Sequence, residues 1–294
     1  MVLVSAVITT HKRAPEYVER AILSILSQTY KNIETIVVDD SPSDFALRSE
    51  VEKTVLKYAE RGVRYIPHEK CMGACAARNT GLENAKGEFI AYLDDDDVWL
   101  KEKIERQLER FDSDEVALVY CGFQAIYPDG KIVKYPPRGA EGNIYDELVI
   151  SNFIGSTSFP MIRKSALLEI GGFDVLMQSS QDYDVWLRLA EKYEVRCTHS
   201  ILGQYTLNPN ECITSNPKKK IAGLERLNMK LSGYLSIHRE ARWQRRMVLV
   251  RYYAANRRLF KALWVWFKTA WIRPLQVKNN IRFLYMAMLK YFKG

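Results

Sequence analysis

An apolar run at residues 89–93 ends abruptly in four consecutive carboxylates, Asp94, Asp95, Asp96 and Asp97. An uncharged run of this length predicts a strand buried on both faces, which is typical of a parallel sheet. Ligands of such sheets bind beyond the carboxyl ends of the strands, so we expect the acids at the functional edge. Because adjacent anions repel one another, they indicate a bound Mg²⁺ or Mn²⁺ ion. The alternative is an acidic loop that caps a helix starting near residue 98, with Asp97 as its N-cap.

The first half of the chain alternates strand and helix signals, which predicts parallel βαβ units. We expect strands at residues 2–9, 33–38, 63–66 and 89–93, and helices from Pro15 and up to about residue 60. Small residues at 73–79 predict a helix start that packs closely on the sheet. The first strand ends in Thr9, Thr10 and His11, and the second in Asp39 and Asp40. Three strands therefore end in polar or charged clusters.

The second half is less regular. We expect a strand at 116–121, a hairpin turn at 128–130, an exposed loop at 136–139, and a tight turn at 171–174 before a helix at 181–189. The tail beyond Pro217 is expected to be helical throughout. The fold class is thus α/β, with one domain over residues 1–210 and a basic helical region over residues 217–294.

The five cysteines are scattered and suggest no disulfide framework. Cys71 and Cys75 alone are too few for a zinc site without further ligands nearby. A reducing, cytoplasmic compartment is the simpler interpretation. The N-terminus lacks a basic region and a cleavage site, so no signal peptide is expected. No apolar run approaches the length of a membrane span.

Charge is distributed unevenly along the chain. Residues 217–294 contain nineteen Lys and Arg against two Glu, a net charge of +17, whereas the whole chain carries +8 and the first 216 residues therefore −9. Such a split predicts an acidic body and a basic tail with an anionic partner.

Five ordered blocks of residues resemble glycosyltransferase family 2: residues 4–10, 24–30, 36–41, the segment 77–89 leading into Asp94, Asp95 and Asp96, and Gly-Gly-Phe-Asp at 171–174 with Gln181 and Asp182. The resemblance covers roughly residues 3–206. It implies a GT-A fold, which is a mainly parallel Rossmann-like sheet flanked by helices. It also implies transfer of a sugar from a nucleotide-diphosphate donor, with a UDP-sugar favoured, and inversion at the anomeric carbon.

The resemblance assigns the metal and the base. Asp96 is expected to bind Mn²⁺ or Mg²⁺ directly, and Asp94 is the second candidate ligand. Asp94 or Asp95 would hold the ribose hydroxyls or a metal-bound water. Asp182 is the expected general base, because only a positioned proton acceptor is lacking once the leaving group is stabilised. Asp184 is the alternative base.

The resemblance also places the nucleotide. Thr9 and His11 are expected to form the shelf for the nucleobase, and Asp40, or Asp39 in its place, to accept the imide N–H of a uracil or thymine ring. Arg78 would reach the ribose or the diphosphate, since its planar fork suits phosphate oxygens. The alternatives involve no ligand: His11 would be a loop histidine, Asp39 and Asp40 would belong to a helix-capping turn, and Arg78 would form a surface ion pair.

The tail combines basic residues with twelve aromatic ones between residues 239 and 293. Basic amphipathic helices with Trp and Phe lie in the membrane interface, where each Lys or Arg contributes about 1 kcal/mol. We therefore expect a cytoplasmic enzyme, peripheral on the inner membrane face, with an anionic membrane surface as a partner. The alternatives are packing of the tail on the acidic body and, less favoured, single-stranded nucleic acid; no nucleic-acid partner is predicted.

The expected acceptor is a lipid-linked oligosaccharide for a surface polysaccharide, to which one sugar is added per encounter. One rival is a sugar nucleotidyltransferase, which would need a glycine-rich loop after the first strand, where residues 9–13 have no glycine. The other rival is a catalytically silent membrane or nucleic-acid binding protein, which the retention of Asp96 and Asp182 disfavours.

Overall fold

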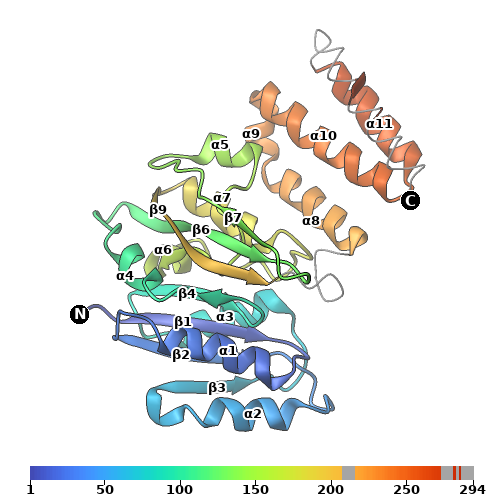
Figure 1. Ribbon diagram of the computed structural model, residues 1–294. Helices are drawn as coiled ribbons and strands as arrows, with labels where there is room; N and C mark the ends of the chain where they lie inside the picture. The colour runs from blue at the N-terminus through green and yellow to red at the C-terminus, as the bar shows by residue number, and fades with distance from the viewer. Residues whose placement is uncertain (207–215, 273–280, 283–284, 286–294) are drawn as a thin grey trace. The chain divides into compact units, whose positions relative to one another are not determined.

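The computed structural model describes residues 1–206, 216–272, 281–282 and 285. The chain forms two compact units, shown in Figure 1. The first is built from Met1–Leu148, Asn152–Val175 and Asp182–Asn208, and the second chiefly from the helices that follow Asn216. Across the described ranges, no helix combines the length and the apolar character needed to cross a bilayer.

The first unit contains a mixed sheet, which within the described residues has nine strands in the order β3-β2-β1-β4-β8-β6-β9-β5, with β7 beside β6. The strands are β1 (Val4–Thr10), β2 (Ile33–Asp39), β3 (Val63–Pro67), β4 (Phe89–Asp94), β5 (Val98–Trp99), β6 (Val116–Ile126), β7 (Ile132–Tyr135), β8 (Met161–Arg163) and β9 (Glu194–Thr206). Strands β1 to β4 are parallel, whereas β8 runs antiparallel to β4 and β6. The expected α/β fold class is confirmed, and the predicted turn at 128–130 joins the antiparallel β6–β7 pair.

The carboxyl ends of the parallel strands meet at one edge of this sheet. In the register of β1, Thr9 lies opposite Asp94 of β4, and Thr10 lies opposite Asp39 of β2. Asp39 in turn lies opposite Pro67 of β3. The polar clusters that follow β1, β2 and β4 are therefore neighbours in space, as the repeated strand endings predict.

Helices cover the parallel strands on both faces. The first unit contains α1 (Pro15–Leu26), α2 (Arg48–Leu56), α3 (Ala74–Asn84), α4 (Lys103–Leu108) and α6 (Lys164–Glu169), while α5 (Tyr145–Ile150) and α7 (Gln181–Ala190) begin or end at the boundary of the units. Side chains of β1 alternate between the faces. Val4, Ala6 and Ile8 share one buried cluster with α1 and α2. Val7 points the other way, toward α3.

Gly81 allows α3 to approach β1 closely. A Cβ atom at this position would lie 2.3 Å from Cγ1 of Val7. Gly to Ala inside a helix ordinarily stabilises by about 0.5–1 kcal/mol, but here we expect Gly81→Ala to lower the free energy of unfolding by about 1–3 kcal/mol because of overpacking. Urea unfolding measures the change. Adding Val7→Ala to Gly81→Ala should recover part of the loss. If Gly81→Ala alone were as stable as wild type, the close approach of α3 to β1 would be contradicted.

No helix begins near residue 98, so the interpretation of Asp97 as the N-cap of such a helix is wrong. Val98 and Trp99 form β5, which pairs antiparallel with Gln204 and Gly203 of β9, and α4 begins only at Lys103. Trp99 is buried and donates from its indole nitrogen to the carbonyl of Ser158 at 2.8 Å. The pairing of β5 with β9 joins residues about a hundred positions apart, so the local sequence carries no signal for this strand. Asp97 consequently caps no helix.

Lys103 is completely buried at the start of α4. Its ammonium group donates to Oε1 of Gln107 at 2.7 Å and lies 4.2 Å from the ring centroid of Trp99. Burial lowers the pKa of Lys103 from 10.5 to about 8, although the nearby Cys121 acts in the opposite direction. The folded chain therefore holds a charge at neutral pH in a place that favours the neutral amine.

This burial predicts a pH-dependent stability. Between pH 8 and pH 10.5 the folded state has released the proton of Lys103 and the unfolded state still holds it, so the free energy of unfolding rises with pH across this window. We expect the rise to be about 3 kcal/mol larger in wild type than in Lys103→Met. Urea unfolding of both proteins at neutral and alkaline pH isolates the difference from other titrating groups. Parallel pH profiles would contradict the lowered pKa.

The described part of the second unit that follows Asn216 consists mainly of helices. Its helices are α8 (Pro217–Lys230), α9 (Ser232–Ile237), α10 (Arg239–Ala255) and α11 (Leu259–Ala270), as expected for the tail. Ile221, Trp243 and Met247 belong to a buried cluster that joins α8, α10 and α11. Three of the aromatic residues noted in the tail, Phe283, Tyr291 and Phe292, lie outside the described residues.

Candidate active site

Asp94 lies at the end of β4, at the carboxyl edge of the sheet. Its Oδ1 atom is 2.9 Å from Nη2 of Arg78, and the hydroxyl of Thr157 donates to both oxygens at 3.2 Å. About 29% of the Asp94 side chain remains exposed. The carboxylate is therefore oriented by the chain and still open to a ligand.

Arg13 bridges the next two acids. Its Nε atom lies 2.8 Å from Oδ1 of Asp95, and its Nη2 atom lies 2.7 Å from Oδ2 of Asp96. Burial raises the pKa of Asp95 to about 6, in spite of the charge of Arg13. Burial and the neighbouring charge of Asp94 raise the pKa of Asp96 as well. One arginine thus compensates the repulsion within the acidic cluster only in part.

Asp97 is the most deeply buried of the four acids, with no exposed surface. Its Oδ1 atom accepts from the backbone N–H of Thr206 at 3.4 Å. Its Oδ2 atom has no hydrogen-bond partner within the described part of the chain. Burial, with the charges of Asp94 and Asp96, raises the pKa of Asp97 well above its usual value. The carboxyl group therefore joins β9 to the acidic cluster instead of starting a helix.

The donor set fits a hard divalent cation. Asp94 and Asp96 offer carboxylate oxygens, the ligand type that Mg²⁺ and Mn²⁺ prefer. Both side chains are partly exposed, at 29% and 23%, whereas Asp95 and Asp97 are buried. The raised pKa of Asp96 marks a place where added positive charge would be favourable. The assignment of Asp96 and Asp94 as metal ligands stays a prediction.

Asp40 follows β2 and organises the loop before α3. Its Oδ1 atom accepts from Nδ1 of His68 at 2.8 Å and from the N–H of Met72 at 2.7 Å. Its Oδ2 atom accepts from the N–H of Gly73 at 2.8 Å and from the thiol of Cys71 at 3.4 Å. Although burial opposes this, these donors lower the pKa of Asp40. Four donors from the chain thus surround the group expected to bind the nucleobase.

The other residues expected around the nucleobase lie at the same edge. Asp39 is completely buried and accepts from the N–H of Ser41 and the hydroxyl of Tyr65. Thr9 is partly buried at the end of β1. His11 is exposed and donates from Nδ1 to the carbonyl oxygen of Asp40 at 2.9 Å. The nucleobase roles of Thr9, His11, Asp39 and Asp40 stay predictions.

Arg78 connects the acidic cluster to the segment that carries Asp182. The guanidinium carbon lies 5.5 Å from the ring centroid of Phe173. Burial alone would lower the pKa of Arg78, but Asp94 and, more weakly, Asp182 raise it above its usual value. Asn79 fixes Phe173 through two bonds of 2.8 Å, to its N–H and to its carbonyl. Phe173 is thereby held beside Arg78, and the charge of Asp182 in the first turn of α7 acts on the same guanidinium.

Asp182 and Asp184 differ sharply in their surroundings. Asp182 is partly exposed in the first turn of α7, and its Oδ1 atom accepts from the N–H of Tyr183 at 2.8 Å. Asp184 is buried and paired with Arg188 at 2.8 Å, and Arg188 also donates to the carbonyl of Gly172. Asp184 therefore stabilises the turn before α7 through Arg188. Asp182 is the more exposed of the two carboxylates.

Comparison with known proteins identifies the family. Residues 5–171 match the sequence profile of Glycosyl transferase family 2, which is more than half of the chain. The chain belongs to glycosyl transferase family 2. The resemblance inferred from the five sequence blocks is confirmed.

Relatives of this family include proteins of different length. The putative teichuronic acid biosynthesis glycosyltransferase TuaG of Bacillus subtilis is 31% identical over 73% of this chain and 82% of its own length. WfgD of Escherichia coli, named a UDP-Glc:alpha-D-GlcNAc-diphosphoundecaprenol beta-1,3-glucosyltransferase, is 27% identical over 74% and 82%. An uncharacterized glycosyltransferase of Rickettsia felis is 31% identical over 68% of this chain, but the match spans only 33% of that protein.

A solved structure supports the fold independently. S. aureus TarS 1-349, crystallised in complex with UDP-GlcNAc, superposes with a TM-score of 0.68 over 98% of this chain and 89% of the other, at 14% identity. At this identity the likeness shows the fold, and it confirms the expected GT-A type.

Sequence reasoning missed several residues that the fold brings to this edge. Arg13 follows β1 and pairs with Asp95 and Asp96. His68 follows β3 and joins Asp40 to Thr80, whose hydroxyl is 2.9 Å from Nε2. Both residues follow parallel strands, as do His11, Asp40 and Asp96. That position was the signal that could have found them.

Proposed function

We propose that this chain is an inverting glycosyltransferase that moves a sugar from a nucleotide-diphosphate donor, a UDP-sugar, to a hydroxyl group of its acceptor. The observation that carries the proposal is the position of Arg78. It is ion-paired with Asp94 at the end of β4, and the charge of Asp182 on α7 acts on it as well. One buried cation therefore pairs with a candidate metal ligand and also feels the charge of a candidate base.

The donor would lie along the carboxyl edge of the sheet. Thr9 and His11 would support the nucleobase, with Asp40 or Asp39 accepting its imide N–H. Asp94 and Asp96 would hold Mn²⁺ or Mg²⁺, which stabilises the charge of the diphosphate leaving group when bound. Arg13 and Arg78 keep the carboxylates oriented toward this position. S. aureus TarS, which shares the fold, was crystallised with UDP-GlcNAc and with UDP, and this supports a uridine nucleotide.

Asp182 would remove the proton from the acceptor hydroxyl as that oxygen attacks the anomeric carbon. A single in-line displacement with one base inverts the configuration of that carbon. Asp182 is partly exposed, which lets an acceptor approach its carboxylate from solvent. A general base in such a position contributes about 10²–10⁴-fold to the rate.

The acceptor we propose is a lipid-linked oligosaccharide of a surface polysaccharide. WfgD is named for a diphosphoundecaprenol-linked acceptor, and TuaG for teichuronic acid biosynthesis. Both are similar to this chain over about three quarters of its length. The place of action would be the cytoplasmic face of the cell membrane.

Calorimetry with UDP, TDP, GDP and CMP, each with and without Mn²⁺, tests the donor site. We expect binding of UDP or TDP that requires the metal ion, because the diphosphate is held mainly through it. GDP controls for recognition of the base, and CMP, which differs from UDP in both its base and its number of phosphates, controls for nonspecific nucleotide binding. Absence of nucleotide binding under every condition would refute the proposed enzyme.

The second unit supports the membrane part of the proposal. On α11, the residues at positions i, i+4, i+7 and i+11 share one face, and these are Phe260, Trp264, Phe267 and Trp271. Their exposed fractions are 91%, 60%, 59% and 70%. Lys268 lies over the ring of Trp264 at 3.9 Å. We propose that this aromatic face and its basic neighbours lie in the interface of a bilayer with anionic lipid.

Replacing Trp264 and Phe267 together with serine should weaken binding to vesicles that contain phosphatidylglycerol by at least about tenfold, because two large apolar side chains are lost. Added salt should weaken wild-type binding too. Leu56→Ser, which changes an exposed residue of α2, is the matched control. Vesicle flotation measures both variants, and equal binding of the double variant and wild type would exclude α11 as the contact.

A further inference from the structure

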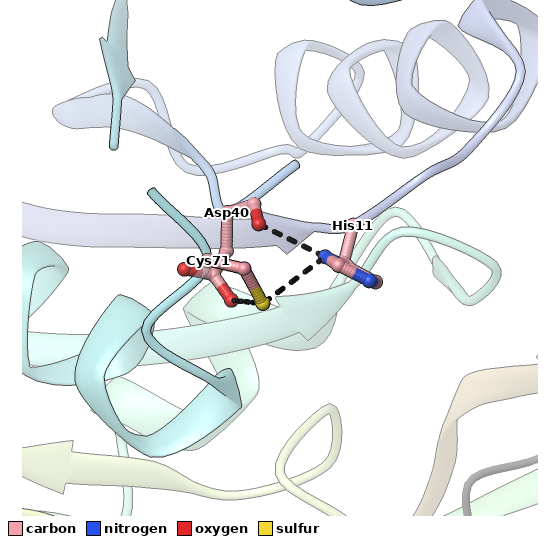
Figure 2. A group of neighbouring side chains, drawn as sticks. All are labelled: His11, Asp40 and Cys71. Atoms are coloured by element: carbon pink, nitrogen blue, oxygen red, sulfur yellow. Dashed lines mark hydrogen bonds between the residues drawn. The ribbon is translucent and has the colours of Figure 1, made fainter. Parts of the chain in front are cut away.

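Three side chains that lie far apart in the sequence form a compact group beside the first two strands. Among the described residues, His11, Asp40 and Cys71 offer one ligand atom each, and these atoms lie within 4.8 Å of one another. Figure 2 shows the three side chains converging: the sulfur of Cys71 faces the carboxylate of Asp40, and the ring of His11 faces both that sulfur and the main-chain carbonyl of Asp40. Cys71 alone is too few ligands for zinc, and the fold supplies two further ones, His11 and Asp40.

We propose that His11, Asp40 and Cys71 bind a soft divalent cation such as Zn²⁺, and that this cation excludes the donor nucleotide. This site differs in its ligand types from the carboxylate site of Asp94 and Asp96. A thiolate and an imidazole select Zn²⁺, whereas carboxylates alone suit Mg²⁺ and Mn²⁺. The exclusion of the nucleotide, unlike the cation site itself, rests on the proposed function.

Two of the three separations between ligand atoms are close to those that a tetrahedral zinc ion requires, and all three are within 4.8 Å. Zinc bonds of about 2.0–2.3 Å separate the ligand atoms by roughly 3.3–3.6 Å. Sγ of Cys71 is 3.4 Å from Oδ2 of Asp40 and 3.9 Å from Nδ1 of His11. Cys71 and His11 are exposed, so both can move slightly and a cation can enter from solvent. A water molecule would complete the coordination.

The protons balance without a further reactant. The Cys71 thiol donates to Oδ2 of Asp40, and Nδ1 of His11 donates to the carbonyl of Asp40. On cation binding, the thiol proton leaves to solvent, and the neutral imidazole changes tautomer: Nδ1 loses its proton to solvent and Nε2 takes one up, so that Sγ and Nδ1 become ligands and the bond from Nδ1 to the carbonyl of Asp40 is given up. Asp40 is held meanwhile by His68, Met72 and Gly73. The site is therefore preorganised around its carboxylate.

The same geometry explains why the cation and the nucleotide would exclude each other. Three of the four acceptor positions of Asp40 are taken by His68, Met72 and Gly73, and the fourth faces Cys71. An imide N–H of a uracil ring and a cation would both need this fourth position. His11, the expected nucleobase shelf, would be a ligand of the cation as well.

Cobalt binding to the full chain tests the site directly, because Co²⁺ bound to a thiolate gives a charge-transfer band in the near ultraviolet. We expect this band in wild type, its loss in Cys71→Ser, and displacement of Co²⁺ by Zn²⁺ but not by Mg²⁺. Cys75→Ser is the matched control, because Cys75 is buried and its burial raises the pKa of the thiol to about 11. No band in wild type, or an unchanged band in Cys71→Ser, would overturn the proposal.

Nucleotide binding then tests the exclusion. Zn²⁺ added in the presence of Mn²⁺ should weaken UDP binding to wild type at least about tenfold, while leaving UDP binding to Cys71→Ser within about twofold, since loss of the thiolate removes the preference for zinc. Equal inhibition of both proteins would overturn the exclusion. A cobalt band without any UDP binding would refute the proposed donor site and leave the cation site standing, so the two failures are distinguishable.

Discussion

Asp182→Asn is expected to lower kcat for sugar transfer by about 10²–10⁴-fold, because the amide cannot accept the proton of the acceptor hydroxyl. The change is nearly isosteric, and the bond from the N–H of Tyr183 to the side-chain oxygen can persist. Donor binding should therefore remain close to that of wild type. Initial rates with a UDP-sugar, together with calorimetry of UDP and Mn²⁺, separate the two effects.

Asp184→Asn provides the contrast. Asp184 is buried against Arg188, which also holds the carbonyls of Ile170 and Gly172. Its substitution should lower the free energy of unfolding and impair activity only as far as the turn before α7 loosens. If Asp184→Asn abolished turnover in a fully folded protein and Asp182→Asn did not, the two assignments would have to be exchanged.

Asp96→Asn is expected to weaken metal-dependent UDP binding by more than about 100-fold, because loss of partners that only orient a metal ligand already costs about 10–100-fold. Arg13 keeps its bond to Asp95 in this variant, so the loop retains one of its two ion pairs. Calorimetric titration of UDP at several Mn²⁺ concentrations measures the loss.

Two controls accompany this variant. Asp114→Asn removes a fully exposed carboxylate of the same unit, and UDP binding should be unchanged. Circular dichroism and thermal unfolding establish that Asp96→Asn is folded. Undiminished metal-dependent binding by a folded Asp96→Asn protein would exclude Asp96 as a ligand.

Local patterns predicted most of the sheet. Apolar runs of strand length bounded by polar clusters located β1, β2 and β4, because burial between two layers of helices leaves a continuous apolar signal in such strands. The edge strand β3, which contains Arg64 and buries only Val63 fully, gives a weaker signal. The parallel arrangement then brought Thr9, Asp39 and Asp94 to one edge, as expected. The assignment of a helix near residue 98 was wrong, because β5 exists only through its pairing with β9.

The sequence by itself determined the fold class, the edge that carries the polar strand ends and the acids from which a metal ligand would be drawn. All of these depend on residue spacing within one strand or one turn. Only the tertiary structure decided which acids are open and which are buried, that Arg13 pairs with Asp95 and Asp96, and that Cys71 meets His11 and Asp40. These contacts join residues 29 to 83 positions apart, and side chains at such separations meet only after the parallel strands have aligned their carboxyl ends.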